Sequence, residues 1–288
     1  MHGLECNAAG ELICFRFGIF RLLYRLFLTK NDDDALREWV ERFRSEPFRH
    51  HISHWQQCFL KFDRAAGHVA RCQDAISSAM DRFGERIRNG SSGLGPIPES
   101  LEMNEINIEI PIFLDSMFIY LRLQADTYAE LVTFFYPGRD TGKISSGSFR
   151  NQLRWFTEKE SNFDPAYREI LLANSGWFEL LAGENPKGLR DVIIHHRGIL
   201  QPSWSKPQAG PAKPQIALYR SNGLRDEDVY QRLKEITRGW FLFLDAALNH
   251  FMSRLNKDGL SAGMTEQEGE RKWFEGDELR GFWVYPRV

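Results

Sequence analysis

Cysteine is scarce in this sequence, and neither sign of charge dominates it. The four cysteines, Cys6, Cys14, Cys58 and Cys72, form no C-x-x-C pair. Their spacing predicts neither a disulfide framework nor a zinc site, so we expect no metal, no cofactor and a reducing cytoplasm. The chain has 37 basic and 39 acidic residues, a balance that argues against non-specific binding to duplex DNA. A small, local phosphate site is still compatible with it.

The sequence also lacks a long uncharged apolar run. Leu12–Leu28 is the only membrane-like stretch, but it carries Arg16, Arg21 and Arg25, each of which is costly in hydrocarbon. We expect a buried or interface helix here, or a strand leading into one, with a helix lying on a membrane surface as the alternative. Glycine-rich phosphate loops are absent as well, so NTP hydrolysis has no support.

Stretches rich in glycine, serine and proline divide the chain. The Asn89–Ser100 stretch is typical of a linker, and the Gln201–Gln215 stretch carries four prolines and cannot be helical. The predicted divisions are an N-terminal helical accessory region (1–88), a linker (89–100), a helical bundle (101–256) with a proline-containing hairpin at 199–220, and a C-terminal tail (257–288).

Helical spacing of apolar residues dominates the N-terminal region. Asp32–Asp34 can cap a helix that runs to about Glu46 and is stopped by Pro47. Residues 48–88 contain no proline, but a continuous helix of this length would span ~60 Å. We therefore expect a break near Gly67.

The sequence predicts five helices and two strands in the bundle region and one strand in the tail. Pro111 stands where a first-turn proline belongs, Asp164 and Asp226 can cap helices, and Asn185-Pro186 opens a helix closed by Gly198. The expected helices are 109–135, 146–158, 164–182, 186–197 and 225–255. The expected strands are Ile199–Ser205 and Ile216–Tyr219, which can pair as a hairpin, and Phe282–Tyr285. The predicted fold class is all-α, a helical bundle with an extra N-terminal helical region and a small β-hairpin insertion.

The helix predicted over Pro186–Arg197 carries the strongest chemical signal. Its apolar face is formed by Leu189, Val192, Ile193 and His196, so His196 is expected in the core. Asp191 and His195 lie four residues apart on one flank, where carboxylate and imidazole can form a hydrogen bond. Arg190 lies about 140° from His195, on the other flank.

These residue types suit the cleavage of RNA by its own 2′-hydroxyl. The reaction needs a base and an acid of near-neutral pKa, which histidine provides, and an aspartate can fix the imidazole tautomer. It also needs a cation over the developing phosphorane charge, and the planar guanidinium of arginine matches phosphate oxygens. One helix offers one such histidine for two proton transfers, so a symmetric dimer would supply the second.

The pattern Arg190-Asp191-x3-His195 resembles the Arg-x4–6-His motif of the HEPN (higher eukaryotes and prokaryotes nucleotide-binding) superfamily. The helices over residues 100–256 resemble its helical bundle. The resemblance implies a metal-independent endoribonuclease with Arg190, Asp191 and His195 as catalytic residues. It further implies a homodimer with a composite site and a role in bacterial toxin–antitoxin systems or anti-phage defence.

The partners implied are RNA, a second copy of the chain and an antitoxin or defence protein, without a membrane and in the cytoplasm. Two alternatives stay open. Members of the superfamily also serve as non-catalytic scaffolds or nucleotide- and partner-binding modules. His196 offers a second histidine spacing, with five residues between it and Arg190.

Two further groups of polar residues could carry chemistry. His50, His51 and His54 place two imidazoles four residues apart, with Cys58 one step further, but no third zinc ligand is obvious and we expect a solvated helix face. Another group, on one stripe of an otherwise apolar helix, forms either a buried ion network or a second line of residues facing the active cleft. Its members are Asp115, Arg122 and Asp126.

Overall fold

The computed structural model describes residues 42, 45–90, 98–136, 144, 147–159, 162–184, 187–195, 199–205, 213–219, 225–226, 229–257, 274–275 and 278–279. The chain is mainly helical over these residues, which confirms the all-α fold class. The helical elements are α3 (Glu46–Arg88), α4 (Pro98–Val132), the 3-10 turn η1 (Thr133–Phe135), α5 (Phe149–Arg154), the π-helical turn η3 (Trp155–Lys159), α6 (Pro165–Asn174), α7 (Gly176–Ala182), α8 (Leu189–His195) and α9 (Val229–Lys257).

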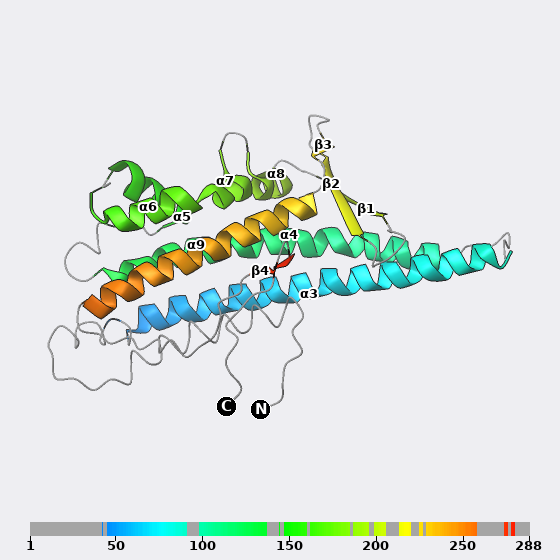
Figure 1. Ribbon diagram of the computed structural model, residues 1–288, viewed down its shortest axis with the longest axis horizontal. Helices are drawn as coiled ribbons and strands as arrows, with labels where there is room; N and C mark the ends of the chain where they lie inside the picture. The colour runs from blue at the N-terminus through cyan, green and yellow to red at the C-terminus, as the bar shows by residue number, and fades with distance from the viewer. Residues whose placement is uncertain are drawn as a thin grey trace, which may run out of the picture.

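α3 and α4 are long helices that lie side by side and run in opposite directions (Figure 1). Ion pairs of Arg82 with Glu102 and of Arg86 with Glu99 join the end of α3 to the start of α4. The predicted break near Gly67 is wrong, because α3 continues unbroken to Arg88. Packing explains the continuity, since apolar residues on both sides of Gly67 are buried and the partner helix supports α3 along its length.

Two prolines lie at informative positions, and the first-turn position predicted for Pro111 is wrong. Pro47 lies in the first turn of α3, where Ser45 caps the helix by accepting from the Phe48 N–H at 3.3 Å, so a helix begins at Glu46. α4 begins at Pro98, and Pro111 lies inside it. Because proline has no N–H, the helical bond to the carbonyl of Asn107 cannot form there.

Several predicted boundaries also change. Ser175 divides the predicted 164–182 helix into α6 and α7, and the 146–158 helix becomes α5 followed by η3. α8 begins at Leu189 instead of residue 186, because Lys187 forms an antiparallel bridge with Glu184. Asp226 is not a helix cap but a residue of β3 (Arg225–Asp226).

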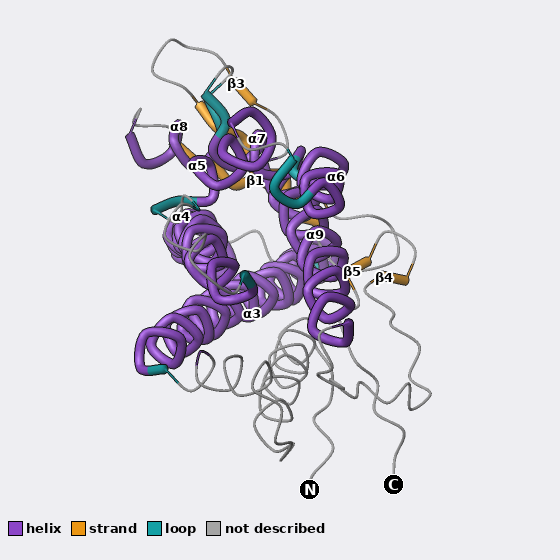
Figure 2. The backbone as a smooth tube through the Cα atoms, turned by 90° about the vertical axis from the view of Figure 1, so that its left-hand side faces the viewer, coloured by secondary structure: helices purple, strands orange, loops and turns teal. Residues whose placement is uncertain are grey.

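The remaining helices pack on α4 and α9 in one hydrophobic core (Figure 2). Gln124 of α4 shows how closely three helices are joined. Its side-chain oxygen accepts a hydrogen bond from the indole N–H of Trp240 on α9 at 2.8 Å. Its backbone carbonyl accepts one from the indole N–H of Trp55 on α3 at 3.0 Å. Residues 46–88, which belong to the predicted accessory region, therefore share the core of the bundle.

The predicted hairpin is confirmed. β1 (Ile199–Ser205) pairs antiparallel with β2 (Lys213–Tyr219), in a register that sets Ile199 opposite Tyr219. β3 adds to β2, and β4 (Phe274–Glu275) pairs with β5 (Glu278–Leu279) in a second sheet. The predicted elements at 12–28 and 282–285 lie outside the described residues, and so does the helix predicted from Asp32 to about Glu46, apart from residues 42, 45 and 46. Among the residues that are described, no helix is both long and apolar enough to cross a membrane.

Candidate functional site

A pocket of about 280 Å³ lies where α4, α5 and α8 meet. Its volume is close to the lower end of the roughly 300–1,000 Å³ typical of small-molecule sites. Three arginines and two aspartates line it, which gives the lining one net positive charge. The lining residues are Ile119, Arg122, Leu123, Asp126, Arg150, Arg190 and Asp191. The pocket thus contains two of the three residues predicted as catalytic.

The apolar face of α8 fixes the orientation of the two polar residues. Leu189, Val192 and Ile193 are buried in the core, as their helical spacing predicts. Arg190 and Asp191 are half-buried and line the pocket. Helix amphipathicity, and not a turn or loop, therefore directs Arg190 and Asp191 into the pocket.

The start of α8 is held close to the end of α7 by Gly188. The N–H of Gly188 donates to the carbonyl of Gly183 at 3.0 Å, and its own carbonyl accepts from Val192 at 3.1 Å. A Cβ atom at position 188 would lie only 2.3 Å from the backbone nitrogen of Ala182. Glycine is required here because the backbones of α7 and α8 approach each other directly.

Arg190 and Asp191 are bonded to each other. Nη1 of Arg190 donates to Oδ1 of Asp191 at 2.7 Å. Helical position predicts Arg190 on the other flank from Asp191 and His195, but its guanidinium reaches the Asp191 carboxylate. The arginine side chain is long and flexible enough to reach the side chain of the next residue, so the position of Arg190 on the helix does not decide where its guanidinium lies.

α4 contributes a second arginine–aspartate pair to the pocket. Nε of Arg122 donates to Oδ2 of Asp126 at 2.8 Å, and Oδ1 of the same carboxylate accepts from the backbone N–H of Phe149 at 2.9 Å. The Arg122 guanidinium lies 4.8 Å from the ring centroid of Phe178. Asp126 therefore fixes the start of α5, and the aromatic ring supports the cation.

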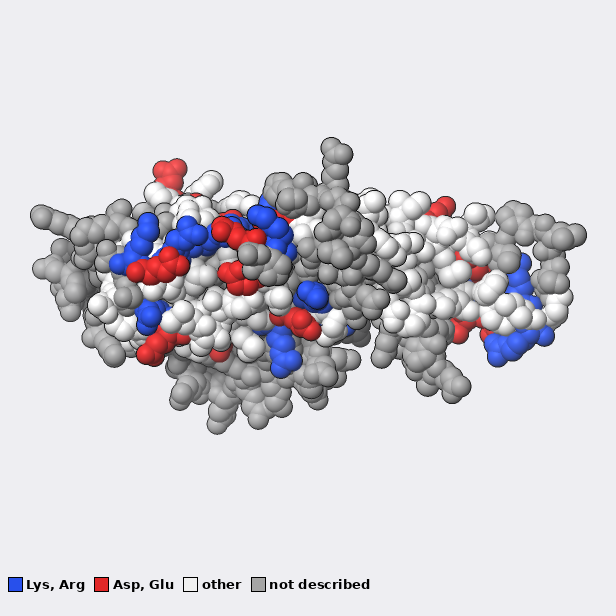
Figure 3. All heavy atoms as spheres, turned by 90° about the horizontal axis from the view of Figure 1, so that it is seen from above, with Lys and Arg blue, Asp and Glu red and all other residues white. Residues whose placement is uncertain are grey.

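Arg150 of α5 completes the set of cations. Its Nη1 contacts the exposed carboxylate of Glu184 at 2.6 Å, and its guanidinium lies 6.0 Å from the Phe178 ring. Arg122 and Arg150 thus flank one buried phenyl ring. Basic and acidic side chains also alternate over the face that carries α5–α8, which shows no broad patch of one sign (Figure 3).

The histidines of the motif are only partly placed. His195 is the last residue of α8, but its side chain and residues 196–198 lie outside the described part of the chain. The Asp191–His195 hydrogen bond and the core position of His196 stay predictions.

Of the predicted polar stripe on α4, Arg122 and Asp126 line the pocket and Asp115 does not. Arg122 and Asp126 form an ion pair and also line the pocket. The first contact is of the kind expected for an ion network, and the second is of the kind expected for residues that face a cleft. The buried Oδ1 of Asp115 has no hydrogen-bond partner among the described residues, and burial raises the pKa of Asp115 to about 6.

Two of the three histidines at the start of α3, His50 and His54, are exposed, as expected of a solvated face, and His51 is half-buried. Nδ1 of His51 contacts Glu130 at 2.8 Å, and Nδ1 of His54 lies 3.0 Å from the hydroxyl of Thr127. Both contacts join α3 to α4. Helical periodicity assigned these residues to one side of α3, where His50 and His54 are exposed, but could not show that His51 and His54 contact α4.

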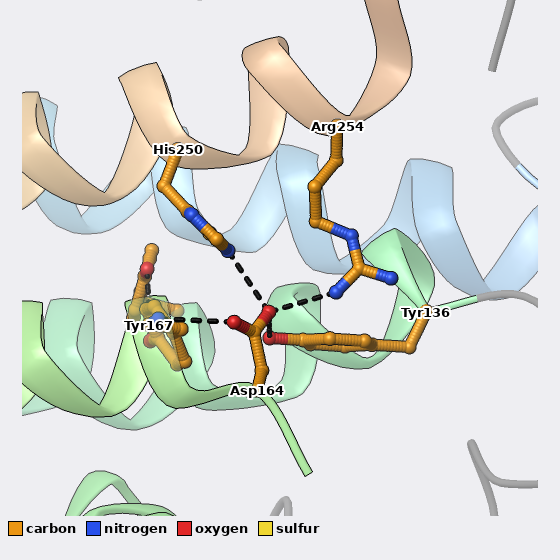
Figure 4. A network of polar contacts seen from close by, with 6 residues as sticks. Tyr136, Asp164, Tyr167, His250 and Arg254 are labelled. Carbon is orange, nitrogen blue, oxygen red and sulfur yellow. Dashed lines mark hydrogen bonds and ion pairs between the residues drawn. The ribbon is translucent and has the colours of Figure 1, made fainter. Parts of the chain in front are cut away.

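A second polar cluster, centred on Asp164, links α6 to α9 (Figure 4). Oδ1 of Asp164 caps α6 by accepting from the Tyr167 N–H at 3.0 Å, as the Asp-Pro sequence predicts. Oδ2 accepts three further bonds, from the Tyr136 hydroxyl (2.9 Å), His250 Nε2 (2.9 Å) and Arg254 Nη1 (2.7 Å). Sequence reasoning found the cap but missed these three partners, which are distant in the chain.

Electrostatics identify this cluster as a stabilising one. Burial alone would raise the pKa of Asp164, but the hydrogen bonds from His250 and the other donors outweigh it and hold the pKa well below its usual value of 3.8. Burial raises the pKa of Tyr136, so its hydroxyl stays neutral and donates. The carboxylate is thus saturated with donors and has no capacity left for a ligand.

No family model, curated protein or solved structure matches this chain.

Proposed function

We propose that the arginine pocket binds a phosphate group of RNA and that the chain is a metal-independent endoribonuclease of the HEPN type. The observation that carries the proposal is the meeting of Arg122, Arg150 and Arg190 in one pocket. Arg190 belongs to the Arg-x4-His pattern, and the other two come from α4 and α5, outside that pattern. Guanidinium groups from three helices form a site suited to the dispersed charge of a phosphorane.

In this proposal the residues of α8 have separate roles. His195 acts as the general base or acid toward the 2′-hydroxyl or the leaving oxygen, a contribution worth about 10²–10⁴ in rate. Arg190 stabilises the phosphate charge. Asp191 positions the Arg190 guanidinium through its 2.7 Å bond. Arg122 and Arg150 assist Arg190 in binding the phosphate.

The homodimer of the proposal has a candidate surface on α4. Ile108 and Ile112 are 69% and 59% exposed, although both are large apolar residues. They share a helical face with Ile119, which lines the pocket, because Ile108 and Ile112 are four residues apart and Ile112 and Ile119 are seven residues apart. A second copy docked on this stripe would cover apolar surface next to the pocket and supply a second His195.

The non-catalytic alternative is favoured by one specific observation. Each arginine of the pocket is paired with a carboxylate: Arg122 with Asp126, Arg150 with Glu184, and Arg190 with Asp191. Such pairs are compatible with a module that binds a phosphate or a partner protein without cleaving RNA. Within the ribonuclease proposal, the chain acts in the cytoplasm in a toxin–antitoxin or anti-phage defence system, and an antitoxin or defence protein is its partner.

The test is the incubation of purified protein with end-labelled single-stranded RNA in EDTA. We expect the wild type to cleave and to leave 2′,3′-cyclic phosphate ends, and His195→Ala and Arg190→Ala each to lose cleavage while remaining folded. His196→Ala is the matched control, which destabilises the protein but leaves the cleavage of the folded fraction intact.

Other outcomes would redirect the proposal. RNA binding without cleavage at any protein concentration supports the binding module. Loss of cleavage in a folded His196→Ala variant would transfer the catalytic role to His196. Equal cleavage by wild type and His195→Ala contradicts the assigned site.

A further inference from the structure

α3 carries two His-x3-Cys pairs, His54 with Cys58 and His68 with Cys72. Residues four apart lie on one helix face, so each pair directs an imidazole and a thiol the same way. The two pairs differ in what α4 places beside them. His54 meets the hydroxyl of Thr127, whereas His68 meets the carboxylate of Glu109.

The second pair therefore belongs to a three-residue cluster. One ligand atom each from His68, Cys72 and Glu109 lies within 4.8 Å of the other two, and the described residues contain no other group of three or more His, Cys, Asp or Glu so arranged. Nε2 of His68 is 2.9 Å from Oε2 of Glu109. The residues come from two helices that the shared core holds in register.

The imidazole of His68 is held in position by an aromatic ring. Its centroid lies 3.7 Å from that of Phe113, with 28° between the ring planes. Phe113 is one turn after Glu109 on α4, so the stacking directs an edge nitrogen of His68 toward the carboxylate. Orientation of a ligand by its surroundings is a general property of built metal sites.

We propose that His68, Cys72 and Glu109 bind a zinc ion between α3 and α4. A nitrogen, a thiolate and a carboxylate oxygen form a ligand set that suits zinc, and three protein ligands leave a fourth position for water. In tetrahedral coordination the ligand atoms are about 3.4–3.6 Å apart. Side-chain rotation therefore has to separate Nε2 of His68 from Oε2 of Glu109, which are 2.9 Å apart, and to bring together ligand atoms that lie up to 4.8 Å apart. Calcium and magnesium require mostly oxygen ligands, which this cluster does not provide.

Zinc binding changes the protonation of the cluster. Burial raises the pKa of the Cys72 thiol, the nearby Glu109 carboxylate raises it further, and Arg71 lowers it. Binding displaces the thiol proton, which passes to solvent, and the thiolate forms the bond to the metal. Arg71, which contacts Nδ1 of His68 at 3.2 Å, is exposed and can turn away when Nε2 binds the ion.

The site is separate from the arginine pocket. Glu109 and Arg122 are 13 residues apart on α4, which corresponds to about 20 Å along the helix axis. A zinc ion here would clamp α3 to α4 and would leave the metal-independent chemistry of the pocket unchanged. The inference therefore stands or falls independently of the ribonuclease proposal.

The experiment is a metal titration of the reduced, chelator-treated full-length protein, with Co²⁺ as the spectroscopic probe for zinc. We expect one equivalent of Co²⁺ to bind with a sulfur-to-cobalt charge-transfer band and the visible bands of tetrahedral Co²⁺, and Zn²⁺ to abolish both. Cys72→Ser should remove the charge-transfer band. Glu109→Gln, an isosteric change at a largely exposed side chain, should weaken Co²⁺ binding by at least about tenfold without affecting folding.

Cys58→Ser is the matched control, because Cys58 is also buried on α3 and follows a histidine at the same spacing. It should leave the spectrum unchanged. Absence of a charge-transfer band at saturating Co²⁺ would overturn the proposal. So would a band that survives Cys72→Ser, disappears with Cys58→Ser, or forms with unchanged affinity in Glu109→Gln.

Discussion

Arg190 and Asp191, neighbours in sequence, form a 2.7 Å ion pair whose members both line the pocket between α4, α5 and α8. The carboxylate orients the guanidinium but also partly neutralises it. A phosphate that enters the pocket must compete with Asp191 for the donors of Arg190. Asp191 therefore has two opposing effects, a lower affinity for phosphate and a better orientation of the Arg190 guanidinium, and the two can be measured independently.

The first prediction concerns this competition. Asp191→Asn removes a negative charge from the pocket while preserving side-chain size, so single-stranded RNA should bind as tightly as to the wild type or tighter. Cleavage should fall by about 10-fold to 100-fold, because the guanidinium is no longer fixed. Fluorescence anisotropy and single-turnover kinetics measure the two effects. Glu158→Gln, which removes a carboxylate outside the pocket, should change neither.

A second prediction compares two arginines one turn apart on the same helix, α5. Arg150 lines the pocket, whereas Arg154 is more exposed and contacts Glu158 instead. Arg150→Ala should weaken RNA binding and reduce the slope of log affinity against log salt by about 0.7, the value for one lost phosphate contact on a single strand. Arg154→Ala should preserve the slope. Equal effects of the two substitutions would show that RNA binds outside the pocket.

Gly188 provides a third prediction. In Gly188→Ala the new methyl group overlaps the Ala182 backbone, so α8 has to move away from α7. We expect a loss of about 1–3 kcal/mol in the free energy of unfolding, measured in urea, together with weaker RNA binding. Gly84→Ala is the control in α3, where a Cβ meets nothing within 4 Å. Because alanine favours helix, that substitution should stabilise by about 0.5–1 kcal/mol.

The fourth prediction concerns self-association. Ile112→Glu places a charge in the middle of the apolar stripe on α4 and should convert a dimer to a monomer in sedimentation velocity. Leu172→Glu is the matched control on α6, where the leucine is 54% exposed but distant in sequence from the stripe. A wild-type monomer at all concentrations, or equal effects of both substitutions, would contradict the proposed surface.

The Asp164 cluster gives a fifth prediction, on pH dependence. Because the pKa of Asp164 is lowered on folding, its contribution to stability is complete above the ordinary value of 3.8 and is lost as pH falls through the folded value. Asp164→Asn should lose about 3 kcal/mol at neutral pH, since it breaks a buried charge pair. Its unfolding free energy should then decline less steeply with acid than that of the wild type.

Denaturant unfolding across the acid range measures this difference. The substitution Asp74→Asn, on an exposed part of α3, serves as the control and should follow the wild-type pH profile. A wild-type and an Asp164→Asn curve that stay parallel below pH 4 would show that the carboxylate is not stabilised by its partners.

The sequence predicted correctly those features that depend on interactions between residues close together in the chain. The buried face of α8, the Asp164 cap of α6 and the β1–β2 hairpin all depend on residues close together in the chain. Pro111 and Gly67 were misjudged because a local rule treats each as a helix boundary. Burial along α3 and α4 outweighs the cost of one missing hydrogen bond or one flexible residue.

The candidate sites divide in the same way. The sequence alone indicated Arg190, Asp191 and His195 as candidate residues, and helical periodicity grouped Arg122 with Asp126 because it assigns residues to faces. Only the tertiary structure added Arg150 to the pocket, and only it brought Glu109 beside the His68–Cys72 pair. The reason is physical: periodicity fixes the direction in which a side chain leaves its own helix, whereas the packing of helices distant in the chain decides what it meets.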